Sequence, residues 1–183
     1  SATATPTPQG SSPTPAVGVA PLTQLLPSDI DDPAAQCAAI SPPFQWEMPG
    51  LVQALSCTDP GLPGGQVYAF QVNSRPNFET SWQNYTTWRG IGSLNPGPNC
   101  PPAPGGAGIV GFHNQFFPPF PGQVLQCETV GSSGGTQPTY SWAYPTEDAF
   151  IVAQGVPGSS FSALDSWWRQ NSAPVSSPRP DGS

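Results

Sequence analysis

The residue patterns of this chain that could support catalysis are few and isolated from one another. Residues 131–135, Gly-Ser-Ser-Gly-Gly, match the G-x-S-x-G string of a nucleophile elbow, in which the serine lies on a sharp turn between a strand and a helix. No apolar helical pattern follows this string, and a Gly-Ser run that links two strands produces the same letters. We therefore interpret residues 131–135 as a link between strands.

Two further patterns involve a histidine and a pair of acids. Glu147 and Asp148 are adjacent, and glycoside hydrolases use two carboxyl groups, but neighbouring residues of a strand or turn point in different directions. We interpret them as acids of a hairpin turn. His113 is the only histidine, and the sequence near it contains no identifiable nucleophile or orienting acid, which a general base would need. We predict no catalytic residues and no cofactor in this segment.

The four cysteines, Cys37, Cys57, Cys100 and Cys127, form no C-x-x-C pair. A zinc site would therefore lack a local pair of ligands, and we predict no metal site. An even number of cysteines in a proline-rich chain indicates two disulfides in an oxidising compartment. Of the three connectivities we favour Cys37 to Cys57 and Cys100 to Cys127, because each bridge then ties a long loop to the following strand. Each should stabilise the fold by about 3 kcal/mol.

The composition is that of one loop-rich domain. Of 183 residues, 27 are proline and 20 are glycine, and only 8% are charged. The net charge of −7 and the absence of lysine make nucleic acid an improbable partner, because no basic patch could neutralise phosphates. No apolar run reaches the roughly 18 residues that span a bilayer, and the first residues do not form a signal peptide. We expect a soluble domain cut from a longer protein.

The chain divides into three segments by composition. Residues 1–21 are rich in proline, threonine and serine and lack periodicity, which predicts an extended linker. Its Thr-Pro repeats are also compatible with O-glycosylation, although a plain spacer is the simpler interpretation. Residues 22–171 form the predicted folded domain, and residues 172–183 form a loose tail.

Acidic residues cluster before the first cysteine. Asp31 or Asp32 precedes Pro33, which indicates the N-cap of a helix with proline in its first turn. Together with Asp29 these acids could instead bind calcium, but they lack the glycine and the distal glutamate of a calcium-binding loop. We favour the capping interpretation.

Large side chains are most concentrated between residues 139 and 169. Tyr140, Trp142 and Tyr144 alternate with small residues, which is typical of a strand with one buried face. A turn at residues 145–148 and a second apolar run then predict a β-hairpin. The segment that follows has helical spacing. The hairpin and the helix each have one apolar face, so we expect them to pack on each other.

These patterns predict an α+β fold, an antiparallel sheet of about five strands with two main helices packed on one face and two disulfides. The predicted strands are residues 51–58, 66–73, 122–130, 138–144 and 148–154. One predicted helix covers residues 75–88, where Phe78, Trp82 and Tyr85 share a face. The other covers residues 160–170.

Two aromatic segments broken by proline are the candidate exposed apolar surface. Phe44 and Trp46 lie in the first, and Phe116, Phe117 and Phe120 lie in the second, whose prolines exclude it from a central strand. An exposed apolar patch of this kind marks a binding surface. We predict a ligand-binding or dimer surface formed by these five residues.

The order of several short motifs along the chain resembles one protein family. The motifs are LLPSD at 25–29, Cys37, ALSC at 54–57, the strand with Tyr68 and Phe70, the helix ending in Trp88, NCP at 99–101, GQVLQC at 122–127, Tyr-Ser-Trp at 140–142 and LDSWW at 164–168. In this order and spacing, from about residue 22 to 171, the chain resembles the extracytoplasmic C-terminal sensor domain of mycobacterial transmembrane serine/threonine protein kinases.

The resemblance implies a cytoplasmic kinase domain, one membrane helix, a proline-rich spacer and then this domain outside the membrane, anchored only through the parent chain. The ATP-binding and transferase activity would belong to the parent, since this segment contains no kinase motif. We expect a sensor or dimerisation module that responds to an extracellular ligand, such as a cell-wall fragment or small molecule. The alternatives are a secreted cell-envelope hydrolase using His113, a serine and a carboxylate, and a structural cell-wall domain.

Overall fold

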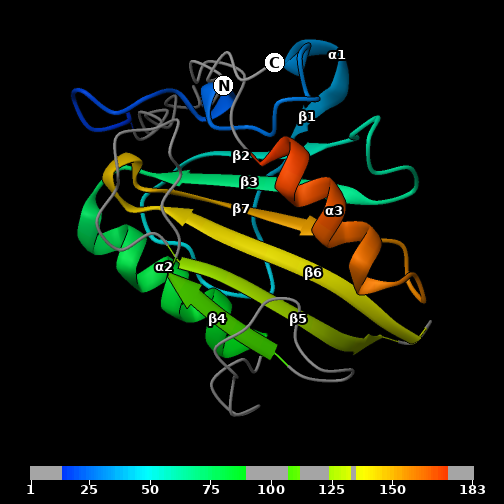
Figure 1. The fold of residues 1–183 in the computed structure, drawn as a ribbon. Helices are drawn as coiled ribbons and strands as arrows, with labels where there is room; N and C mark the ends of the chain where they lie inside the picture. The colour runs from blue at the N-terminus through cyan, green and yellow to red at the C-terminus, as the bar shows by residue number, and fades with distance from the viewer. Residues whose placement is uncertain (1–13, 90–106, 112–123, 133–134, 173–183) are drawn as a thin grey trace, which may run out of the picture.

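The computed structural model describes residues 14–89, 107–111, 124–132 and 135–172. Its centre is one antiparallel sheet of seven strands in the order β1-β2-β3-β7-β6-β5-β4 (Figure 1). The strands are β1 Cys37–Ala39, β2 Leu51–Cys57, β3 Gln66–Val72, β4 Ala107–Gly111, β5 Val124–Ser132, β6 Gly135–Tyr144 and β7 Ala149–Gln154. The α+β class and the five predicted strands are confirmed, and the short strands β1 and β4 are added at the two edges.

In the ranges that the structure describes, three α-helices and two 3-10 helices accompany the sheet. They are α1 Pro33–Gln36, α2 Arg75–Trp88, α3 Phe161–Asn171, η1 Leu22–Gln24 and η3 Pro145–Glu147. Both predicted main helices are therefore confirmed. The Asp32 side chain accepts a hydrogen bond from the Ala35 N–H at 3.3 Å, as the capping interpretation predicted. Ser160 caps α3 in the same way, by accepting from the Ala163 N–H at 3.4 Å.

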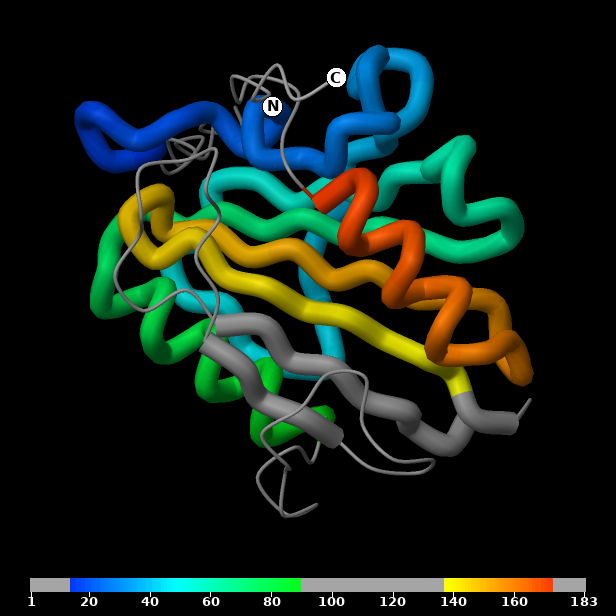
Figure 2. The backbone as a smooth tube through the Cα atoms, viewed as in Figure 1, coloured from blue at the N-terminus to red at the C-terminus, as the bar shows by residue number. Residues whose placement is uncertain are grey.

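The prediction that both main helices pack on one face is wrong, because α2 and α3 lie on opposite faces of the sheet (Figures 1 and 2). Alternate residues of β7 explain the difference: Ile151 packs in the cluster with α3, whereas Phe150 and Val152 pack in the cluster with α2. Residues 149–153 are all buried, and a strand buried on both faces needs cover on both sides. The continuous apolar run of β7 thus requires a helix on each face.

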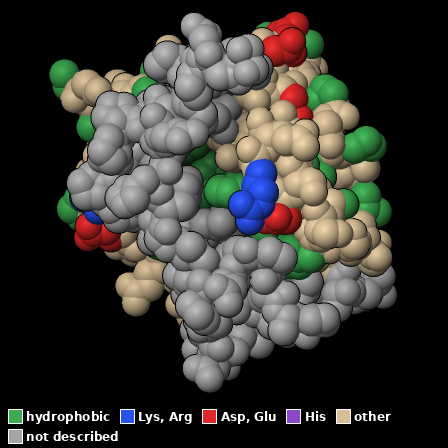
Figure 3. All heavy atoms as spheres, in the orientation of Figure 1, with side chains coloured by type: hydrophobic (Ala, Val, Ile, Leu, Met, Phe, Trp, Pro, Cys, Tyr) green, Lys and Arg blue, Asp and Glu red, His purple; other side chains and the backbone are tan. Residues whose placement is uncertain are grey.

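The α3 layer has a buried aromatic core and a polar outer side. Tyr140, Trp142 and Tyr144 of β6 are fully buried beneath α3. The Tyr140 hydroxyl donates to Asp165 Oδ1 at 2.5 Å, and Arg169 Nε donates to Asp165 Oδ2 at 2.8 Å. Figure 3 shows a basic side chain beside an acidic one on this face, as expected from that ion pair. The Asp165 carboxylate therefore connects the helix to the sheet.

An N-terminal strap, residues 20–32, crosses the end of the sheet on the α3 side. Its apolar side chains, including Leu22 and Leu26, are buried in the same core as α3. The Ser28 N–H donates to the Asn171 carbonyl at 2.8 Å. Gln71 Nε2 donates to the Ala20 carbonyl at 2.8 Å. The strap is thus bonded both to α3 and to the sheet.

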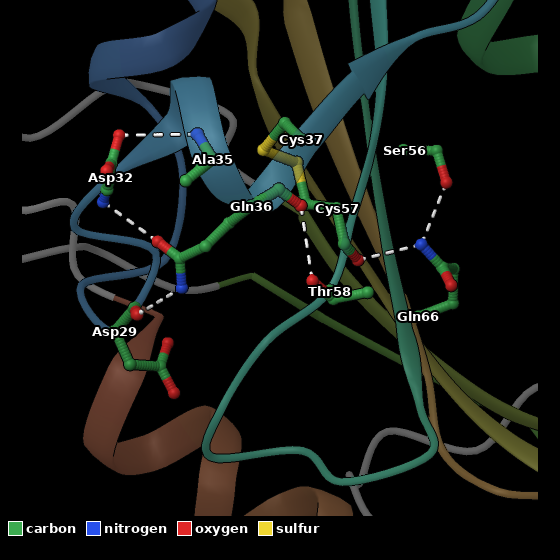
Figure 4. Close-up of a disulfide and its surroundings, with 9 residues drawn as sticks. All are labelled: Asp29, Asp32, Ala35, Gln36, Cys37, Ser56, Cys57, Thr58 and Gln66. Atoms are coloured by element: carbon green, nitrogen blue, oxygen red, sulfur yellow. Dashed lines mark hydrogen bonds between the residues drawn. A yellow bond between two sulfur atoms is a disulfide. The ribbon is translucent and has the colours of Figure 1, made fainter.

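Among the described residues the structure has one disulfide, Cys37–Cys57 (Figure 4). It joins β1 to β2 at a point where the two cysteines face each other in register, so it fastens a three-residue edge strand to the sheet. The second predicted bridge involves Cys100 and lies outside the described residues. The structure therefore supports one disulfide and leaves the second as a prediction.

Hydrogen bonds around the disulfide hold the strap against β2. Gln36 Nε2 donates to the Asp29 carbonyl at 3.2 Å, and its Oε1 accepts from the Asp32 N–H at 2.8 Å (Figure 4). On the other side, the Thr58 hydroxyl donates to the Gln36 carbonyl at 3.3 Å.

No helix in the described ranges has the length and apolar character that would let it cross a bilayer.

Candidate functional site

A groove with a volume of about 380 Å³ opens on the α2 side of the sheet. Its wall and floor include six aromatic side chains, Phe44, Trp46, Tyr68, Phe70, Tyr85 and Trp88, together with the amides of Gln45 and Gln154. Among the described residues, no lysine, arginine, aspartate or glutamate lines it. The volume falls in the range of about 300 to 1,000 Å³ that small-molecule sites occupy. The groove is therefore a neutral, aromatic candidate site.

Strand register places the floor of the groove. Tyr68 of β3 lies opposite Val152 of β7, and Gln66 lies opposite Gln154 two pairs further along. Side chains two residues apart on a strand share a face, so Tyr68 and Phe70 point to the same side as their β7 partners. The floor is a two-strand surface that changes from aromatic to polar toward the Gln154 end.

The walls come from two separate segments. Tyr85 and Trp88 are three residues apart near the end of α2, a spacing that places them on one helical face. Phe44 and Trp46 come from the loop between β1 and β2, which contains three prolines. Trp46 is central: its ring centroid lies 4.9 Å from that of Trp88, 5.2 Å from Tyr85 and 5.9 Å from Phe44. The aromatic contacts between these residues join the loop to the helix.

The sequence-predicted surface residues divide into two groups. Phe44 and Trp46 are half-buried, because one side of each packs against the sheet and α2 while the other lines the groove. Phe116, Phe117 and Phe120 lie outside the described residues. The prediction that all five form one surface therefore stays a prediction, while two of them belong to the groove.

Several polar groups of the groove are uncommitted. Within the part of the chain that the structure describes, the Tyr68 hydroxyl and the side-chain amides of Gln45 and Gln154 have no hydrogen-bond partner. The Trp46 Nε1–H is buried and likewise has no acceptor among these residues. Buried polar groups usually have partners. These groups are available to a ligand that offers hydrogen-bond donors and acceptors.

Arg89 fixes the end of α2 beside the groove. Its guanidinium carbon lies 5.5 Å from the centroid of the Trp88 ring, and Nη2 donates to the Thr139 hydroxyl at 2.9 Å. Thr139 of β6 is buried and lies opposite Gln154 in the sheet. The arginine therefore holds Trp88 in place by a cation–π contact and a hydrogen bond to the sheet.

No match exists among protein-family models, curated proteins or solved structures. The resemblance to kinase sensor domains consequently rests on the order of the sequence motifs alone.

On the α3 side, two carboxylates meet at one indole. Trp167 Nε1 donates to Asp29 Oδ2 at 3.0 Å and to Asp59 Oδ1 at 3.1 Å, and the Gly61 N–H donates to Asp59 Oδ1 at 2.8 Å. The pKa of Asp59 is raised to about 7, mostly by burial and to a smaller extent by the neighbouring Asp29. Asp29 therefore belongs to this pair. The described residues contain no group of three or more potential metal ligands.

The remaining catalytic patterns have structural explanations where they are described. β5 ends at Ser132 and β6 begins at Gly135, and these two residues pair in the sheet, so the Gly-Ser string links two strands as predicted. Glu147 ends η3 and accepts a hydrogen bond from the Ala20 N–H. Asp148 follows in a left-handed conformation with φ of 50°. Both are turn acids, and His113 lies outside the described residues.

Of the described residues that line the groove, the sequence predicts only Phe44 and Trp46 as site residues. Among those it misses are Tyr68, Trp88, Gln45 and Gln154. The sequence places Tyr68 on a strand face and Trp88 at the end of a helix, but the prediction that both helices pack on one face gives the two residues no shared location. The continuous apolar run of β7 is the signal that could have placed them, because it implies a second covered face.

Proposed function

We propose that this chain is a non-catalytic recognition module that binds a partner in the aromatic groove on the α2 face. The observation that carries the proposal is the combination of aromatic walls with the uncommitted Tyr68 hydroxyl and the free amides of Gln45 and Gln154. A few placed polar groups in an otherwise aromatic cleft are typical of sites that bind rather than transform a ligand.

We further propose that the module is the extracytoplasmic sensor domain of a bacterial receptor-type serine/threonine protein kinase. The order of motifs from LLPSD to LDSWW supports this assignment, as do the proline-rich residues 1–21 and the disulfide, which is typical of an oxidising compartment. The parent chain carries the kinase activity. Occupancy of the groove controls it by changing how the receptor assembles, since paired receptors raise the local concentration of their kinase domains.

The experiment uses the full-length parent protein in membranes. Trp88→Ala removes a groove side chain that is 41% exposed, and Val156→Ala, at a site that is 39% exposed outside the groove, is the matched control. We expect Trp88→Ala to alter kinase autophosphorylation and Val156→Ala to leave it unchanged. Equal autophosphorylation by the two variants would refute the proposal that the groove controls the kinase. A parent sequence without a kinase domain would refute the proposal that the parent is a receptor kinase.

A further inference from the structure

We propose that the groove binds the proline-threonine segment, residues 1–16, of a second copy of this chain. This inference rests on the proposed function and names the occupant of the same groove. The segment reads SATATPTPQGSSPTPA, with prolines at positions 6, 8, 13 and 15. Proline-rich segments in the polyproline II conformation bind aromatic-lined grooves, because they are extended in advance and lose little conformational entropy on binding.

The polar groups of the groove suit such a ligand. A polyproline II segment makes no internal hydrogen bonds, so its carbonyl oxygens need external donors. The Tyr68 hydroxyl and the amides of Gln45 and Gln154 can donate, and among the described residues none of these groups has another partner. The aromatic faces of Trp88 and its neighbours supply the surface for the proline rings.

Charge also matches on the two sides. No charged side chain of the described residues lines the groove, and residues 1–16 contain none either. Docking therefore buries no unpaired charge, which would be strongly unfavourable. An acidic or basic peptide would not share this property.

The position of the strap favours a second copy over the same chain. The Ala20 carbonyl is held by Gln71, which lies opposite Ala149 at one end of β7 and is buried on the α3 side. The polar end of the groove is at Gln154, five residues further along β7, about 17 Å at the usual strand rise. It also lies on the other face of the sheet. A segment from a second copy reaches the groove without passing round the sheet, and reciprocal exchange gives a closed two-fold dimer.

Sedimentation of the full chain over a wide concentration range tests the exchange. We expect the wild type to form dimers. Two variants should have dimer dissociation constants at least about tenfold higher than that of the wild type. They are Trp88→Ala and the quadruple variant Pro6→Ala, Pro8→Ala, Pro13→Ala, Pro15→Ala. Val156→Ala should dimerise as the wild type does. Tyr68→Phe removes only a hydroxyl and should weaken association without affecting the fold. This variant therefore tests the groove even if Trp88→Ala does not fold.

Mixing the two weakened variants gives the sharper test. Trp88→Ala retains an intact segment and the proline variant retains an intact groove, so their mixture should regain one of the two contacts and form heterodimers more readily than either variant forms homodimers. A wild type that stays monomeric at tens of micromolar overturns the inference. So does a change in tryptophan fluorescence on proline replacement in a monomer, which would show that the chain's own segment fills its groove.

The two proposals fail in different ways. If Trp88→Ala changes autophosphorylation of the parent but the chain never self-associates, the groove is a recognition site for some other ligand and only the second-copy inference is overturned. Adding cellotriose provides one such check: a shift in tryptophan fluorescence that Trp88→Ala abolishes, with no dimer present, would assign the groove to a saccharide.

Discussion

Replacing Asp59 with asparagine should make the protein more stable at pH 8 and remove most of the loss of stability that we expect between pH 5 and pH 8. In the wild type, Asp59 and Asp29 both accept from the Trp167 indole N–H, and Asp59 is only 4% exposed. Two carboxylates in such a site are most stable when they share one proton. An asparagine reproduces the neutral form of Asp59 at every pH.

The magnitude follows from the pKa of Asp59, which burial and the nearby Asp29 raise from 3.8 to about 7. Because the folded protein holds a proton that the unfolded chain has already released, the free energy of unfolding is highest below pH 3.8 and falls as pH rises to about 7. Three pKa units correspond to about 4 kcal/mol as an upper limit. About two of these three units lie between pH 5 and pH 8, so we expect a loss of about 2 to 3 kcal/mol over that range.

Urea denaturation at pH 5 and pH 8, with the disulfide intact, measures this difference. At pH 8 the free energy of unfolding of Asp59→Asn should exceed that of the wild type by about 2 kcal/mol or more. At pH 5 the difference between the two proteins should be smaller. Burial also raises the pKa of Asp148. Asp148 therefore makes stability fall as pH rises in the wild type and in Asp59→Asn alike. Asp31→Asn, at an exposed acid, is the control. An Asp59→Asn variant that keeps the wild-type pH dependence would refute the reasoning.

Two further predictions concern the sheet edge and the core. Replacing both Cys37 and Cys57 by alanine should lower the free energy of unfolding by about 3 kcal/mol, because the bridge closes a loop with a sequence separation of 20; urea denaturation measures it, and an unchanged midpoint would contradict the role assigned to the bridge. Leu164→Ala in α3 should cost about 2 to 4 kcal/mol, since Leu164 is 1% exposed in the core; thermal unfolding compared with Val156→Ala tests this, and equal losses would contradict it.

The sequence predicted the elements that carry local patterns. β2, β3, β6 and β7 have alternating or continuous apolar residues bounded by turn residues, and α2 and α3 have helical spacing. β1 has only three residues and no periodicity, and its place depends on pairing with a strand that begins twelve residues after it ends. Such pairing is decided by the whole fold and leaves no mark in a short window of sequence.

The groove was only partly predictable for the same reason. Phe44 and Trp46 could be selected as binding residues because prolines on both sides keep them out of regular structure. Gln154 could not be selected, because its value as a site residue depends on the register that sets it opposite Gln66 and on the helix that ends beside it. The Asp29 and Asp59 pair was equally hidden, since only folding brings the strap to the turn after β2.

The attachment of the strap has a mechanical consequence. If the residues ahead of Ala20 tether this domain, tension on the tether is delivered first to Ala20, which is bonded to Gln71 of β3 and to Glu147 of η3. It reaches the contacts of Ser28 and Asp29 with α3 only afterwards. A pull from the anchor would therefore strain β3 and the turn between β6 and β7 before it strains α3.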